Sequence, residues 1–159
     1  SIDTREGVDV VKSRIGIGVK AVLIFPGSDV FKTVDSLNRE SKIDCVIIDE
    51  AQFLSIDQVD QLCKVVDLLS IPVIAYGLRA DFRGELFEGS MRLLAMADTV
   101  EEIKTVCWCS KKAIMNARVV NGKVVKEGEQ ILIGGNESYI ALCRKHWAEG
   151  NLGKKKEEK

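Results

Sequence analysis

The stretch Cys45–Leu54, "CVIIDEAQFL", decides how the first half of the chain folds. An apolar run suited to a buried strand is followed at once by two adjacent carboxylates, Asp49 and Glu50. Charged side chains beside a buried strand are costly unless they hold a partner, and helix capping is one alternative. However, the following helix has its own start signal, with Ser55 as N-cap and Gln58 at the capping-box position. We therefore expect Asp49 and Glu50 to lie free of that helix, in the loop that leaves the strand.

Strand-like and helix-like segments alternate on both sides of this stretch. The strand-like runs are "VKAVLIF" (19–25), "IDCVIID" (43–49) and "IPVIAYG" (71–77), with a further strand expected around 100–107. Apolar residues at helical spacing predict helices after Ser28, from Ile56 to about Leu69, and around 86–96. This alternation predicts an α/β domain with a mostly parallel sheet.

The loop after the third strand, "GLRADFRGELF", should lie at the same sheet edge as Asp49 and Glu50. Ligands bind at the carboxyl edge of open parallel sheets, so Arg79, Asp81, Phe82 and Arg83 are expected near the two acids. An apolar strand that ends in Asp-Glu is the Walker B pattern. There the Asp holds Mg²⁺, and a neighbouring acid orients or deprotonates the nucleophile. Such a short string also occurs by chance, so it does not identify the site alone.

From Cys107 onward the sequence has a different texture. It contains short β-like pieces and a hairpin signal at Asn121-Gly122. We expect an α/β domain over residues 1–106, a small β module over 107–147, and a charged, flexible tail over 148–159.

Three of the five cysteines cluster in this module with the only histidine. Cys107-x-Cys109 and Cys143-x-x-His146 form two ligand pairs, which predicts a closed, structural zinc site with four protein ligands. The alternative is a set of free thiols with an incidental histidine. Zinc would fix the ends of the segment "ILIGGNESYIAL", where Gly134-Gly135 let the backbone approach a ligand and Tyr139 offers a ring or hydroxyl. An ordinary glycine-rich hairpin turn explains that segment equally well.

The overall composition gives no sign of a nucleic-acid or membrane partner. The formal net charge is −1, and there is neither a bilayer-length apolar run nor a signal-peptide pattern. An odd number of cysteines argues against a disulfide framework. We expect a cytoplasmic protein.

Taken together, the motifs resemble one family, the zinc-containing (type II) thymidine kinases of bacteria, phages and animals. The strings that carry the resemblance are "VIIDEAQFL", "IPVIAYGLRADFRGELFEGS", the Cys-x-Cys pair, "EGEQILIGGNESY" and "CRKHW". The resemblance implies a P-loop NTPase-like domain and a zinc module with a lasso loop. It also implies transfer of the ATP γ-phosphate to the 5′-hydroxyl of thymidine in deoxynucleoside salvage, with Mg²⁺ accompanying ATP, and assembly as a homotetramer.

The resemblance also assigns roles to particular residues. Glu50 would be the general base at the 5′-hydroxyl, and Asp49 would belong to the Mg²⁺ environment. Asp3 and Arg5 match a segment close to the phosphates. The residues implied in nucleoside binding are Phe53, Phe82, Ile133, Gly134, Gly135 and Tyr139.

One family motif does not occur in the 159 residues. The phosphate-binding string G-x-x-x-x-G-K-[S/T] is missing, so we expect a fragment without the first strand, the phosphate loop and its helix. Such a chain would keep nucleoside contacts but transfer phosphate poorly. Two alternatives remain. "DEAQ" echoes a helicase-like ATPase, although the balanced charge and 6% aromatic content argue against it. A non-enzymatic zinc-ribbon interaction module fused to a degenerate ATPase half is the other.

Overall fold

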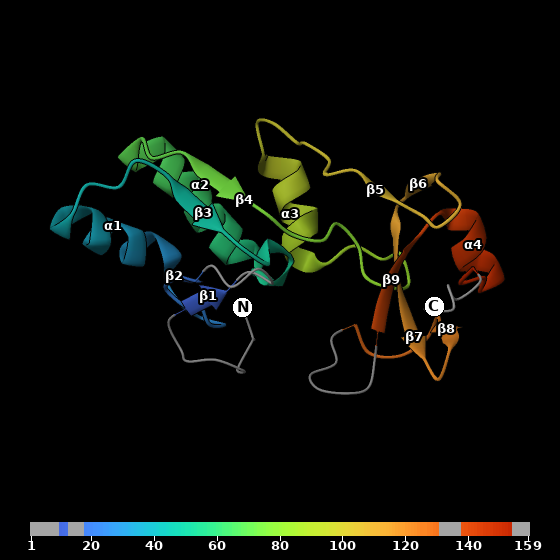
Figure 1. Cartoon of the computed structure of the whole chain (residues 1–159). Coiled ribbons are helices and arrows are strands. Elements are labelled where there is room, and N and C mark those ends of the chain that lie inside the picture. Colours follow the sequence, from blue (N-terminus) through green and yellow to red (C-terminus); the bar gives the residue numbers. More distant parts are fainter. Residues whose placement is uncertain (1–9, 13–17, 131–137, 154–159) are drawn as a thin grey trace. The chain divides into compact units, whose positions relative to one another are not determined.

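The computed structural model describes residues 10–12, 18–130 and 138–153, which form a mixed α/β protein (Figure 1). The chain divides into two compact units, Ser1–Gly77 and Leu78–Lys159. The domain boundary predicted near Val106 lies within the second unit and stays a prediction. Asp3, Arg5, Ile133, Gly134 and Gly135 lie outside the described residues.

The centre of the first unit is a βαβ arrangement, as the sequence predicts. Strands β3 (Val46–Ile48) and β4 (Val73–Ala75) pair in parallel, with Val46 opposite Val73 and Ile48 opposite Ala75. Helix α2 (Ile56–Leu69) makes the connection between them, and helix α1 (Val30–Glu40) packs against α2. Buried aliphatic side chains fill this unit: Val30, Val34, Ile48, Val59, Leu62 and Val65.

The two helices of this unit begin at different kinds of cap. The predicted capping box is confirmed, because the Ser55 side chain accepts a hydrogen bond from the Gln58 N–H while the Gln58 side chain accepts one from the Ser55 N–H. Helix α1, in contrast, is capped by Asp29 and not by Ser28. The Asp29 carboxylate accepts from the Lys32 N–H, whereas the Ser28 hydroxyl accepts from the Phe25 N–H and closes the preceding turn.

All four predicted strands are shorter than expected: β3 and β4 keep the centre of the runs 43–49 and 71–77, whereas the other two are largely lost. A short strand β2 (Gly18–Lys20) pairs antiparallel with β1 (Val10–Lys12), but residues 21–25 form no strand, and Phe25 is 59% exposed. A strand needs a neighbour for its hydrogen bonds, and no described strand pairs with this run. The strand expected around 100–107 is likewise reduced to β5 (Thr105–Val106), which pairs with β6 (Lys112–Ala113).

The second unit contains a three-stranded antiparallel sheet with β7 (Met115–Val120) between β8 (Lys123–Val125) and β9 (Ser138–Leu142). The predicted hairpin is confirmed: Asn121 and Gly122 link β7 to β8 with φ of 50° and 73°, as a type I′ turn requires. Helix α3 (Glu88–Met96) precedes β5, and helix α4 (Arg144–Glu149) follows β9 (Figure 1). None of the helices in the described part of the chain has the length and apolar character to cross a bilayer.

Candidate functional site

The acidic pair follows β3 directly, at the carboxyl end of the parallel strands. The ladder continues one step past each strand, because Tyr76 N–H donates to the Ile48 carbonyl at 2.8 Å and Ala51 N–H donates to the Tyr76 carbonyl at 2.8 Å. These bonds fix the backbone on both sides of Asp49 and Glu50. Both acidic residues are exposed, so the loop presents two carboxylates to solvent.

Glu50 adopts a backbone conformation that few residues other than glycine accept. Its φ and ψ are 52° and 38°, in the left-handed region, which costs about 1–2 kcal/mol for a residue with a Cβ. Its N–H donates to Asp49 Oδ1 at 2.9 Å. Glu50 precedes the short 3₁₀ helix η1 (Ala51–Phe53) without a side-chain capping bond, and Ser55 caps α2. Helix capping therefore does not explain these carboxylates.

Gln52 holds the Glu50 side chain, and sequence reasoning missed it. Gln52 is 2% exposed, and its Nε2 donates to Glu50 Oε2 at 2.5 Å. A Cβ added at Gly77 would lie 2.7 Å from Gln52 Oε1 and 2.9 Å from Gln52 N, so only glycine fits there. The sequence signal that could have identified Gln52 is its place as a polar residue between Ala51 and Phe53 in the "DEAQFL" run. The Gln52 amide therefore orients the Glu50 carboxylate, and hydrogen bonds already fix the backbone on both sides of Glu50.

The two aromatic residues expected to line the nucleoside site differ in exposure. Phe53, in η1, is 42% exposed, whereas Phe82 is 2% exposed and covered by protein atoms. Phe53 belongs to the first unit and Phe82 to the second. Their shared role in one pocket stays a prediction.

Asp81 organises the loop that carries Phe82. Its carboxylate accepts hydrogen bonds from the N–H groups of Arg83 and Glu85, from Arg83 Nε and from Gln130 Nε2, and it pairs with Arg83 Nη2 at 2.8 Å. Burial raises the pKa of the Asp81 carboxyl, but these hydrogen bonds outweigh it and lower the pKa below its ordinary value. Asp81 and Arg83 thus shape their own loop, while Arg79 is exposed.

The second unit brings together the four residues predicted to bind zinc. One ligand atom from each of Cys107, Cys109, Cys143 and His146 lies within 4.8 Å of all the others. Cys107 Sγ is 3.4 Å and Cys143 Sγ is 3.5 Å from His146 Nδ1. Three sulfur donors and one imidazole nitrogen from two short-spaced pairs are the set that tetrahedral Zn²⁺ takes. The grouping predicted from spacing is confirmed.

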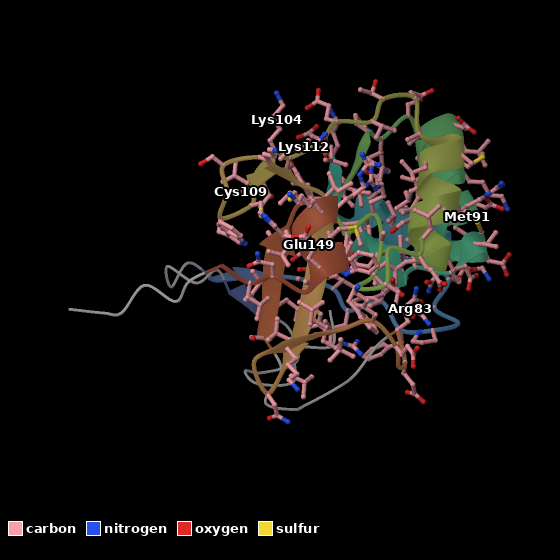
Figure 2. All side chains as sticks on the ribbon, turned by 90° about the vertical axis from the view of Figure 1, so that its right-hand side faces the viewer. Arg83, Met91, Lys104, Cys109, Lys112 and Glu149 are labelled. Carbon is pink, nitrogen blue, oxygen red and sulfur yellow. The ribbon has the colours of Figure 1, made fainter. Side chains whose placement is uncertain are left out.

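Local backbone structure places each ligand pair. Between β5 and β6 the chain turns tightly, because Cys107 N–H donates to the Lys111 carbonyl and Ser110 N–H donates to the Cys107 carbonyl, each at 2.8 Å. Figure 2 shows Cys109 on this loop and Glu149 on α4. Cys143 is the N-cap of α4 and His146 lies in the first turn, which brings Cys143 Sγ within 3.5 Å of His146 Nδ1.

The environment of Cys107 favours the thiolate form of its side chain, which is the form that binds a metal. Cys107 is 2% exposed, and this burial raises its pKa; hydrogen bonds from the Cys109 N–H and His146, and then from the Cys143 N–H and the Cys109 thiol, outweigh it. Together they lower the pKa of Cys107 from 9.0 to about 6. A metal-binding thiol must lose its proton, so the lowered pKa favours metal binding at neutral pH.

Trp108, a residue that the sequence reasoning passed over, covers the histidine ligand. Its ring stacks on His146 with centroids 4.2 Å apart, and its Nε1 donates to the Asn151 carbonyl at 3.2 Å. A Cβ at Gly153 would lie 2.9 Å from the indole. The residues after α4 therefore hold Trp108 against the ring of His146, which fixes the ring orientation.

The fold and the site define a class of α/β protein that has exposed carboxylates at a strand end and a cysteine–histidine cluster able to hold a metal ion. The thymidine kinase family model matches residues 1–147. The chain belongs to the thymidine kinase family. This membership decides against the helicase-like and zinc-ribbon alternatives.

Curated relatives support the same conclusion. The chain is 57% identical over 148 residues to the thymidine kinase of Lactococcus lactis, covering 92% of this chain and 77% of that protein. It is 53% identical over 150 residues to the thymidine kinase of Enterobacteria phage T4, covering 94% and 77%. It is 51% identical over 156 residues to that of Legionella pneumophila strain Paris, covering 97% and 75%.

Proposed function

We propose that the protein transfers the γ-phosphate of ATP to the 5′-hydroxyl of thymidine, producing thymidine monophosphate and ADP. The observation that carries this proposal is the match of residues 1–147 to the thymidine kinase family. The exposed acidic pair at the end of β3 supports it, because phosphoryl transfer requires positioning and charge neutralisation at such an edge.

Glu50 is the proposed general base. As the 5′-oxygen attacks the γ-phosphorus, the bond between that phosphorus and the β–γ bridging oxygen breaks. The hydroxyl proton passes to the Glu50 carboxylate. The bond from Gln52 Nε2, at 2.5 Å, and the fixed left-handed backbone orient this carboxylate before the substrate arrives. A preoriented base needs less reorganisation in the transition state.

Asp49 is the carboxylate proposed to lie in the Mg²⁺ environment. Its Oδ1 accepts the Glu50 N–H at 2.9 Å, and the residue is exposed, so it offers the kind of oxygen ligand that Mg²⁺ prefers. Bound Mg²⁺ would neutralise negative charge on the ATP phosphates. The zinc ligands take no part in the reaction, because all four positions are filled by protein.

The remaining roles rest on the resemblance. We assign a P-loop NTPase-like fold to the first domain and phosphate contacts to Asp3 and Arg5. Assembly as a homotetramer and a cytoplasmic location belong to the same proposal. Nucleoside contacts are assigned to Phe53, Phe82, Ile133, Gly134, Gly135 and Tyr139.

The test is a turnover assay on the protein that contains these 159 residues, with Glu50→Gln as the variant. Loss of a general base should lower kcat by about 10²–10⁴-fold. The matched control is Glu40→Gln, an exposed glutamate at the end of α1, which should leave kcat unchanged. An unchanged kcat in Glu50→Gln contradicts the role of Glu50. If the protein that carries these residues together with a phosphate-binding loop does not phosphorylate thymidine, the proposed activity is wrong.

A further inference from the structure

Arg118 is a buried arginine that the proposed mechanism does not use. It lies in β7 and is 1% exposed. In the antiparallel ladder it sits directly opposite Tyr139 of β9. A buried guanidinium is costly unless its N–H groups are well bonded, so its contacts show what it holds in place.

Among the described residues, the Arg118 guanidinium donates hydrogen bonds to groups on two different segments. Nε donates to the Tyr139 hydroxyl at 3.0 Å, Nη1 donates to the Glu129 carbonyl at 3.0 Å, and Nη2 donates to the Gln130 carbonyl at 3.2 Å. The hydroxyl belongs to β9, and the carbonyls belong to the segment after β8. One side chain thus bonds residues on both sides of the segment 131–137.

The flat face of the same guanidinium covers Phe82. Its Cζ lies 3.7 Å from the centre of the Phe82 ring and 5.8 Å from the centre of the Tyr139 ring. A cation over an aromatic face is attracted by the ring quadrupole, more strongly when water is excluded. Arg118 therefore contacts both described aromatic residues of this unit that the proposed function places at the nucleoside.

A second set of bonds holds the same groups from other directions. The Phe82 carbonyl accepts from Trp147 Nε1 at 2.9 Å. Gln130 Nε2 donates to Asp81 Oδ2 at 3.2 Å, so Gln130 is held through its side chain as well as through its carbonyl. The Phe82 ring also lies near the Arg83 guanidinium, whose Cζ is 5.8 Å from the ring centre, but the Arg118 guanidinium lies closer, at 3.7 Å.

We propose that Arg118 is a positioning residue for thymidine recognition, which sets Phe82, Tyr139 and the Glu129–Gln130 backbone in one arrangement without contacting the substrate. This inference rests on the proposed function. Only arginine supplies a planar fork that bonds two carbonyls and a hydroxyl while its face packs on a ring. A lysine ammonium keeps the charge but loses the fork and the flat surface.

The test variant is Arg118→Lys, and the matched control is Arg144→Lys, an exposed arginine of the same unit. We expect the KM and the calorimetric Kd for thymidine to rise about tenfold in Arg118→Lys, as for loss of a charge-assisted bond. The kcat should change less than threefold, and the KM for ATP and the zinc content should stay constant. The control should match the unaltered protein in every measurement.

A double-mutant cycle with Tyr139→Phe tests the connection directly. Tyr139→Phe removes the hydroxyl that Arg118 bonds, so its effect on the thymidine Kd should be smaller in the Arg118→Lys background than alone. Additive effects would contradict the proposal. So would a folded Arg118→Lys protein whose thymidine KM and Kd are within twofold of normal, since a merely structural role changes only the melting temperature.

Failure of this inference is distinguishable from failure of the proposed function. If the unaltered protein neither binds nor phosphorylates thymidine, both are wrong. If it does both and the variants differ only in stability, the inference alone is wrong. Should Arg118→Lys not fold, Arg118→Gln, which retains a planar donor, takes its place. Failure of both to fold with zinc bound would show a structural role and overturn the proposal.

Discussion

The acidic loop after β3 and the cysteine–histidine cluster are built in opposite ways. Asp49 and Glu50 are exposed, adjacent in sequence and held by backbone geometry and by one buried amide. Among the candidate metal ligands, Cys107 and Cys143 are 2% and 7% exposed, and the three-stranded sheet lies between them in the chain order. Carboxylates that are proposed to contact a substrate are thus exposed to solvent, and residues close to them in the sequence orient them. Residues that are proposed to bind a structural metal are instead buried, and they come from segments that are far apart in the sequence.

The largest expected effect is loss of the metal site. In Cys143→Ser, we expect zinc content to fall from about one per chain to near zero, since a hydroxyl is a poor zinc ligand. Structural zinc contributes several kcal/mol to folding, so the second unit should melt at a much lower temperature. Metal analysis and calorimetry measure both. The control is Cys45→Ser, an exposed free thiol; zinc retention in Cys143→Ser would contradict the assignment.

The next largest effect is expected at Gly77. In Gly77→Ala the new Cβ would meet Gln52 Oε1 at 2.7 Å and backbone at 2.9 Å, so we expect a loss of about 1–3 kcal/mol in the free energy of unfolding. Gly27→Ala provides the contrast, because Gly27 has open space but a φ of +83° and should lose only about 1 kcal/mol. Denaturant unfolding measures both. Equal losses would show that the contact with Gln52 is easily relieved.

A smaller effect on catalysis is expected at Gln52. Gln52→Met keeps the length of the buried side chain but removes the donor to Glu50 Oε2. We expect kcat to fall about tenfold, as for one lost hydrogen bond to a charged group, with the KM for thymidine unchanged. Steady-state kinetics measure both constants. A full kcat would mean that the strained backbone alone orients the base.

The smallest effect is expected at the cap of α2. Ser55→Ala removes the acceptor of the Gln58 N–H and should cost about 1 kcal/mol in the free energy of unfolding. Ser28→Ala is the matched control, because the Ser28 hydroxyl closes only an exposed turn and Asp29 caps α1. Chemical denaturation should show a loss for Ser55→Ala alone. Equal losses would mean that the turn before α1 is as important as the cap.

Structural features that depend on residues close together in the sequence could be predicted from the sequence. Ser55 and Gln58 lie three apart and bond each other, Asn121-Gly122 accept the left-handed backbone of a tight hairpin, and the Cys107–Cys109 pair lies on one turn. Strand extent was less predictable. The run from Ala21 to Phe25 has strand composition, but a strand exists only where another strand accepts its hydrogen bonds.

The sequence by itself determined the capping box, the hairpin, the βαβ connection and the grouping of three cysteines with one histidine. The first two depend on residues within one turn, the third on the alternation of strand and helix patterns, and the last on two short-spaced ligand pairs. Only the tertiary structure decided that Gln52 orients Glu50 against Gly77 and that Arg118 joins Phe82 to Tyr139. The physical reason is that a buried polar side chain is fixed by its partners, and several of these partners are distant in the chain. Gly77 is 25 residues from Gln52, and Tyr139 and Phe82 are 21 and 36 residues from Arg118. Burial removes water as a competing hydrogen-bond partner, so contacts with residues distant in the sequence determine how these side chains are oriented.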